Sequence, residues 1–185
     1  MLLLSPFCGP AAPFGATLPP ADARRFVMPI YADGQAAPVA VLRVESLTTD
    51  YEKRGFFRVG LLPKAVFTGV SVELDSVERL PVALANLQNL IQRSRREQSW
   101  ELRLVRVTVR SGPPHLLAIG RVTPDGAKAW RLEQLSQLSA GGSSRTLASG
   151  RLSASGQLEL AAQSVPISLL VWLAGEPATR ATSNP

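Results

Sequence analysis

Apolar and polar residues alternate through most of residues 39–174, and the alternation is interrupted once, by a stretch with helical spacing. The clearest alternation covers residues 151–160, where Leu, Ala or Gly occupies every second position and polar or charged residues lie between them. A period of two is typical of a strand with one buried face and one face in water, as in a half-exposed antiparallel sheet. The chain is therefore predicted to be mainly β.

Further strand-like segments lie close together along the chain. We expect strands at 25–31, 39–47, 55–62, 66–74, 100–110, 115–122, 127–135, 146–162 and 165–174. A polar turn is expected at 48–52, Pro63 is expected to end the third strand, and Gly150 to bend or divide the strand at 146–162. The apolar phase changes between Leu104 and Val105, which a β-bulge, or burial on both faces, would explain. Short connections favour a meander of antiparallel hairpins.

One amphipathic helix is predicted at about 80–97. Five apolar residues fall at helical spacing in this stretch: Leu80, Leu84, Leu87, Leu90 and Ile91. Pro81 suits the first turn of a helix, where its missing N–H costs no hydrogen bond. The predicted fold class is therefore α+β and mainly β, a twisted antiparallel sheet of short strands with this helix packed on one face.

The length of 185 residues predicts a single domain, which we expect at 26–174, with a disordered tail at 175–185. Residues 1–25 resemble the second half of a secretory signal, because an apolar start is followed by small residues before Arg24. The basic start of such a signal is missing, so a disordered, Pro-rich segment is the alternative. We expect an exported, periplasmic protein, with the cytoplasm as the alternative. No apolar stretch has the length of a membrane-spanning helix.

Few residues in the sequence carry chemistry. The one cysteine, Cys8, excludes an internal disulfide and a cysteine-based zinc site. The one histidine, His115, follows two prolines, has no acidic neighbour in the sequence, and is accompanied by no nucleophile elbow. We therefore predict a non-catalytic protein without a cofactor or metal. A hydrolase that uses His115 is the enzymatic alternative.

The net charge of +6 and the pI near 10.4 suggest an anionic partner. The densest basic group is Arg93, Arg95 and Arg96, at the C-terminal end of the predicted helix. Positive charge there also stabilises the helix dipole by about 0.3–1 kcal/mol per residue, so the group has a structural explanation as well. No aromatic residue is interleaved with these arginines, which argues against nucleic acid. We predict that they contact lipid headgroups or another anionic membrane surface.

Three tryptophans, Trp100, Trp130 and Trp172, fall on three separate predicted strands. Large aromatic residues are most often part of the core, but the three could also line a shared apolar pocket. If the interior is a groove rather than a dry core, these tryptophans are the candidate ligand-binding residues.

The strand pattern at 56–63 and 70–74, with a similar cadence at 104–109 and 150–156, resembles the AsmA and TamB group and the related LptC and OstA-type proteins of lipopolysaccharide transport. The resemblance implies an envelope location and an apolar groove that shields lipid acyl chains. The predicted function is a non-catalytic envelope scaffold or lipid-handling module with an apolar sheet groove. The alternative is an interaction module, in which an exposed strand edge pairs with a strand of another envelope protein.

Overall fold

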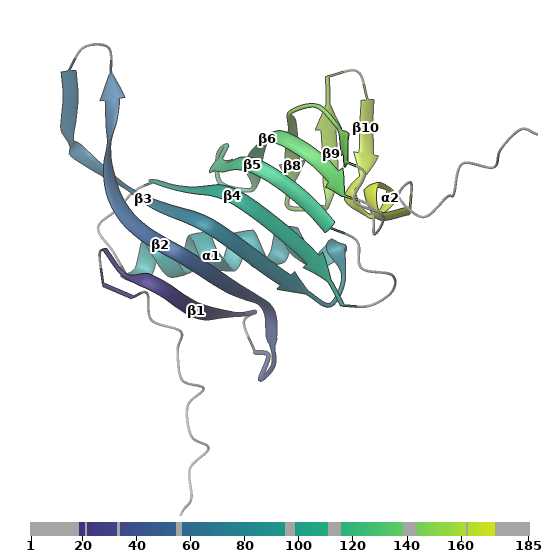
Figure 1. The fold of residues 1–185 in the computed structure, drawn as a ribbon, viewed down its shortest axis with the longest axis horizontal. Helices are drawn as coiled ribbons and strands as arrows, with labels where there is room; N and C mark the ends of the chain where they lie inside the picture. Colours follow the sequence, from purple (N-terminus) through teal and green to yellow (C-terminus); the bar gives the residue numbers. More distant parts are fainter. Residues whose placement is uncertain are drawn as a thin grey trace, which may run out of the picture.

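The computed structural model describes residues 19–20, 22–32, 34–54, 57–94, 99–110, 116–138, 144–161 and 163–172. Over these ranges ten strands form one sheet, in the order β1-β2-β3-β4-β5-β6-β8-β9-β10, with β7 paired to β6 (Figure 1). The strands are β1 (Arg24–Tyr31), β2 (Pro38–Arg54), β3 (Phe57–Leu74), β4 (Ser99–Val109), β5 (Leu116–Pro124), β6 (Ala129–Leu138), β7 (Ser144–Thr146), β8 (Gly150–Ser153), β9 (Gln157–Leu160) and β10 (Gln163–Pro166). The mainly β fold with one principal helix is confirmed.

The helices are η1 (Val77–Arg79), α1 (Leu80–Ser94) and α2 (Ile167–Trp172). The predicted helix is confirmed from Leu80 to Ser94, and residues 95–98 lie outside the described ranges. The short helix η1, which leads directly into α1, follows the capping rules, because the Ser76 hydroxyl accepts a hydrogen bond from the Glu78 N–H at 3.3 Å. Figure 1 shows α1 behind β2–β4, so one face of the sheet is turned to the viewer and the other to the helix.

The strand pairing differs from the predicted meander at one place. Strands β3 and β4 are parallel, with Lys64 opposite Ser99 and Leu74 opposite Val109, whereas every other pair is antiparallel. Parallel neighbours need a long connection, and α1 supplies it. The helix therefore runs back along the sheet between the two strands, and its C-terminal end lies near the start of β4.

The prediction that Pro63 ends a strand is wrong, as is the predicted turn at 48–52. Strand β3 runs through Pro63, which lies opposite Tyr51 of β2. Pairing with β4 begins one residue later, at Lys64, so no β4 neighbour requires the N–H that proline lacks. The polar residues Thr48 to Asp50 continue β2 because they pair with Lys64 to Val66.

The C-terminal strands are also divided differently from the prediction. The alternating segment at 151–160 is a hairpin of β8 and β9, with Leu152 opposite Leu158 and a turn at Gly156, where φ is +83°. Both leucines are buried, so the alternation of apolar and polar residues keeps the same phase on both sides of the turn. The sequence pattern therefore does not show where the turn lies. The segment predicted as a strand at 165–174 ends its pairing at Pro166, and Ile167 begins α2.

The core lies between the sheet and α1. Leu84, Leu87 and Ile91 of the helix belong to one buried cluster with inward-facing residues of β1–β6. Trp130 of β6 belongs to the same cluster and donates a hydrogen bond from its Nε1 to Gln88 Oε1 of α1 at 3.3 Å. The helix and the middle of the sheet are therefore joined by apolar burial and by a polar contact.

The inward-facing phase inverts along one line that crosses the sheet. In a regular strand one outward-facing residue separates two inward-facing ones, but at this line two consecutive outward-facing residues separate them. The buried, inward-facing residues that flank the line in β2 to β6 are, in strand order, Val44 and Leu47, Phe67 and Val70, Leu102 and Val105, Ile119 and Val122, and Leu132 and Leu135. Gly69, Leu104 and Gln134 in this line have left-handed φ angles of 65°, 53° and 56°. We call this line of doubled outward residues the crease. The phase change predicted at Leu104 is confirmed, and four other strands share it.

Candidate functional site

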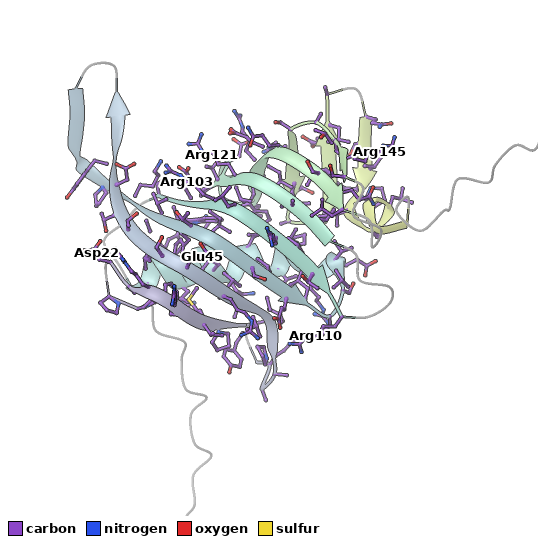
Figure 2. All side chains as sticks on the ribbon, in the orientation of Figure 1. Asp22, Glu45, Arg103, Arg110, Arg121 and Arg145 are labelled. Carbon is purple, nitrogen blue, oxygen red and sulfur yellow. The ribbon has the colours of Figure 1, made fainter. Side chains whose placement is uncertain are left out.

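The face of the sheet opposite α1, which we call the open face, carries most of the charged residues of β2–β6. Among the described side chains, its cations are Arg43, Lys64, Arg103, Arg106, Arg110, Arg121 and Arg131, and its acids are Glu45, Asp50, Glu73, Glu101 and Glu133. Cations therefore exceed acids on this face. Figure 2 shows Arg103 and Arg121 close together, and Arg110 toward the opposite end of the sheet.

Glu101 is the centre of the densest group on the open face. Its side chain is 1% exposed, and it accepts hydrogen bonds from Lys64 Nζ at 2.6 Å, Arg103 Nε at 2.6 Å and Arg121 Nη2 at 3.1 Å. The register produces this group, because Glu101 lies beside Val66, two residues from Lys64, and Arg103 lies opposite Arg121. Three neighbouring strands thus direct three cations to one carboxylate.

The electrostatics keep Glu101 ionised. Burial raises the pKa of this carboxyl, but the hydrogen bonds from Arg103, Lys64 and Arg121 together outweigh burial and lower the pKa to about 2. The hydrogen bond to Glu101 in turn raises the pKa of Arg121. A single buried anion therefore holds three cations in place and leaves their excess positive charge at the surface.

A second group forms around Glu73 of β3. Its carboxylate accepts hydrogen bonds from Arg110 Nη2 at 2.8 Å and Arg43 Nε at 2.9 Å, and these bonds lower the pKa of Glu73. The two arginine side chains remain 61% and 58% exposed, respectively. Each guanidinium has five N–H donors, so both retain donors for a ligand.

Arg106 and Arg131 complete the basic character of the open face. Both are exposed, and neither has an ion pair with another residue of the described ranges. Arg106 lies between Ser71 and Ala118 of the adjacent strands, whose small side chains leave the guanidinium uncovered. The outward positions of β2–β6 that the structure describes hold no aromatic residue for base stacking.

The crease forms a shallow hollow of about 400 Å³ on the open face. Its lining residues are Thr68, Glu101, Arg103, Leu104, Gly120, Arg121, Glu133 and Gln134. A side chain at Gly120 would meet Gln134, because an added Cβ would lie 2.3 Å from the Gln134 Oε1. The absence of a side chain at this position lets the Gln134 side chain lie across β5. This lining suits the binding of charged groups, and within the described ranges no three His, Cys, Asp or Glu residues come together as metal ligands.

The predicted site residues lie elsewhere. Trp100 and Trp130 are buried on the face toward α1, and the Trp100 Nε1 has no hydrogen-bond partner among the residues that the structure describes. The backbone of Trp172 ends α2, and its side chain is outside the described part of the structure. Their role in ligand binding stays a prediction.

Of the predicted arginines, Arg93 is exposed at the end of α1, while Arg95, Arg96 and His115 lie outside the described residues. The predicted site residues do not include Arg43, Arg106 or Arg131. A signal for them was present, because each occupies a polar position of an alternating strand.

Comparisons with protein-family models, with curated proteins and with solved structures found no match. Among the described residues, no helix is both long enough and apolar enough to cross a membrane.

Proposed function

We propose that the protein is a non-catalytic envelope scaffold that docks on anionic lipid headgroups through the arginines of its open face. The observation that carries this proposal is the excess of cations on that face, with Arg106 and Arg131 unpaired within the described ranges. The signal-like residues 1–23 support an envelope location. Docking through the open face replaces the apolar groove of the sequence-based hypothesis as the route to lipid.

Burial in the core is the reason for this change. The inward-facing residues of β2–β6 pack with α1 in one buried cluster that includes Trp100 and Trp130, so helix and sheet share their apolar faces. The open face, in contrast, presents guanidinium groups that make strong, charge-assisted hydrogen bonds with phosphate oxygens. A basic residue near an anionic bilayer contributes about 1 kcal/mol to binding.

Pairing through a strand edge receives less support from the geometry. The edge strand β1 contains Pro29, which lacks a backbone N–H, and the opposite edge strand β10 spans Gln163–Pro166 and ends in a proline. Prolines and short strands at sheet edges are the features that hinder the addition of another strand.

Vesicle co-sedimentation tests the proposal with two charge-matched variants. The first, Arg43→Ser/Arg106→Ser/Arg131→Ser, removes three cations from the open face. The second, Arg93→Ser/Arg95→Ser/Arg96→Ser, removes three from the end of α1 and its following residues. At about 1 kcal/mol per arginine, the first variant should bind phosphatidylglycerol vesicles about 100-fold more weakly, and the second should bind nearly as the wild type does.

Two results would contradict the proposal. The wild-type protein at low salt should sediment with phosphatidylglycerol vesicles and not with phosphatidylcholine vesicles, and the absence of this difference would refute lipid docking. Loss of binding in the second variant alone would move the contact from the open face to the end of α1.

A further inference from the structure

Leu104 of β4 is exposed in a strained backbone conformation. Of the four large apolar residues that the described ranges expose, Leu104 has the largest exposed fraction, 66%. Its φ of +53° lies in the left-handed region, where the Cβ atom of an L-residue crowds its own backbone. A single exposed leucine is common on protein surfaces, but this one also bears a backbone strain that no burial offsets. The combination points to a role outside folding.

The crease explains this backbone conformation but not the choice of leucine. Gly69 of β3 and Gln134 of β6 lie on the same line with φ angles of 65° and 56°, so the geometry accepts glycine or a polar residue. Glycine and asparagine adopt left-handed φ angles more readily than leucine does. Leu104 is also not a member of the buried core cluster, so its side chain does not contribute to the packing against α1. Leucine is therefore not the residue that stability alone would favour here.

The neighbouring strands leave the Leu104 side chain accessible. The register places Leu104 between Gly69 of β3 and Gly120 of β5, and neither neighbour has a side chain that could cover it. Leu104 is one of the residues that line the shallow hollow of about 400 Å³ at the crease. A molecule that lies against the open face can therefore contact the leucine from above and from the side.

Cations surround Leu104 on the open face. Arg103 and Arg106 flank it on β4 as the adjacent outward-facing residues, and Arg121 lines the same hollow from β5. The side chains of Arg103 and Arg121 are 45% and 44% exposed, and Arg106 has no ion pair within the described ranges. Binding to the interface of an anionic bilayer increases with both cationic charge and buried apolar area. A second copy of the chain fits less well, because two cationic open faces would repel each other.

We infer that Leu104 is the apolar anchor of the docked open face. Its side chain lies between the lipid phosphates that Arg103 and Arg106 bind, and it contacts the glycerol esters and first methylene groups beneath them. This inference rests on the proposed function, because the arginines bring the open face to the membrane. Insertion is limited to this one side chain, because other outward-facing residues of the crease, such as Glu45 and Gln134, are polar and stay among the headgroups.

The test measures vesicle binding and thermal unfolding of the full chain, as wild type and as Leu104→Asn. Asparagine tolerates a left-handed φ and removes the apolar contact, so binding should fall without a loss of stability. We expect the variant to bind vesicles of phosphatidylglycerol and phosphatidylcholine in equal parts about five-fold more weakly, with a thermal midpoint equal to or above that of the wild type. The factor should be the same at low and at moderate salt, because salt screens the arginine contacts and not the apolar contact.

Leu169→Asn is the matched control, because Leu169 is 44% exposed and belongs to α2 rather than to the sheet. Its vesicle binding should equal that of the wild type. Three results would overturn the anchor while leaving docking by the open face intact: wild-type binding by Leu104→Asn, an equal loss in the control, or a loss that disappears when the salt concentration is raised. If the wild type fails to bind at low salt, the proposed function itself is wrong.

A spectroscopic variant keeps the inference testable if Leu104→Asn is destabilised. Leu104→Trp places an indole at the anchor position, and its emission, measured as the difference from the wild-type spectrum, should shift to shorter wavelength when vesicles are added. An unchanged difference spectrum would overturn insertion. A shift on addition of polyglutamate, but not of vesicles, would assign the open face to an acidic protein instead.

Discussion

At the scale of single residues, Glu101 organises the open face. A buried carboxylate normally weakens a fold, because leaving water costs several kcal/mol per ion. Glu101 avoids this cost through its three cationic donors on β3, β4 and β5. The same donors would repel one another without it, so the arrangement of Lys64, Arg103 and Arg121 depends on the central anion.

Replacing this carboxylate should destabilise the protein. Glu101→Gln leaves three cations around a neutral amide, and we expect the free energy of unfolding to fall by about 3 kcal/mol. The matched variant Glu73→Gln alters a carboxylate whose two partners are well exposed, and the loss there should be less than about 1 kcal/mol. Urea unfolding at neutral pH compares the two, and equal losses would contradict a central role for Glu101.

The same carboxylate should make stability depend on acid pH. The pKa of Glu101 is about 2 in the folded protein, against 4.5 for an ordinary glutamate. A lowered folded-state pKa contributes stability that is complete above the unfolded pKa and is lost as the pH falls toward the folded value. The urea midpoint should therefore decline between about pH 4.5 and 2, and the decline should be smaller in Glu101→Gln.

At the scale of elements, the crease is the feature that shapes the open face. It gives each of β2–β6 two successive outward positions and places Arg103, Arg121 and Glu133 side by side in a hollow. Gly69 is the most constrained of its members, because its φ is +65° and an added Cβ would lie 2.3 Å from the Glu45 side chain.

We therefore expect Gly69→Ala to lower the unfolding free energy by about 1–2 kcal/mol. Gly34→Ala is the matched control, because Gly34 has a φ of +77° but nothing within 4 Å of its added Cβ. The control measures the backbone strain alone, and the difference in thermal midpoint between the two variants measures the contact with Glu45. Equal midpoints would contradict a crowded crease.

Local patterns predicted the elements better than their pairing. The helical spacing of apolar residues predicted α1 from its first residue to the last one that the structure describes, Ser94. The alternation of apolar and polar residues predicted most of the strands. Patterns of period two did not reveal that Leu152 and Leu158 face each other across a hairpin, because a turn of suitable length preserves the phase. The parallel pairing of β3 with β4, and the passage of β3 through Pro63, depend on contacts between distant segments.

The candidate site was less predictable than the fold for the same reason. The sequence marked Arg93, Arg95 and Arg96 because they are adjacent, whereas the open face gathers Arg43, Arg106 and others from separate strands. The register of pairing places Arg103 opposite Arg121, and no local pattern contains that register.

At the scale of the whole molecule, the sheet is open but has protected edges. Pro29 removes one backbone N–H donor from the edge strand β1. The side chain of Val27 on the same strand is exposed. We expect Pro29→Val to restore a complete edge and to produce association that increases with protein concentration in analytical ultracentrifugation. The wild type should remain at one mass over the same range, and a monomeric variant would show that other features protect this edge.

The crease also limits which deletions a chain of this fold can tolerate during evolution. Neighbouring strands carry their two successive outward-facing residues at matching places. If one of these residues were deleted in a single strand, the inward-facing side chains of the rest of that strand would face outward, and the outward-facing ones inward. Such a deletion would be tolerated only if the adjacent strands lost the same position. Related chains should therefore vary in length at their turns, while the distance along each strand from the crease to its end is retained.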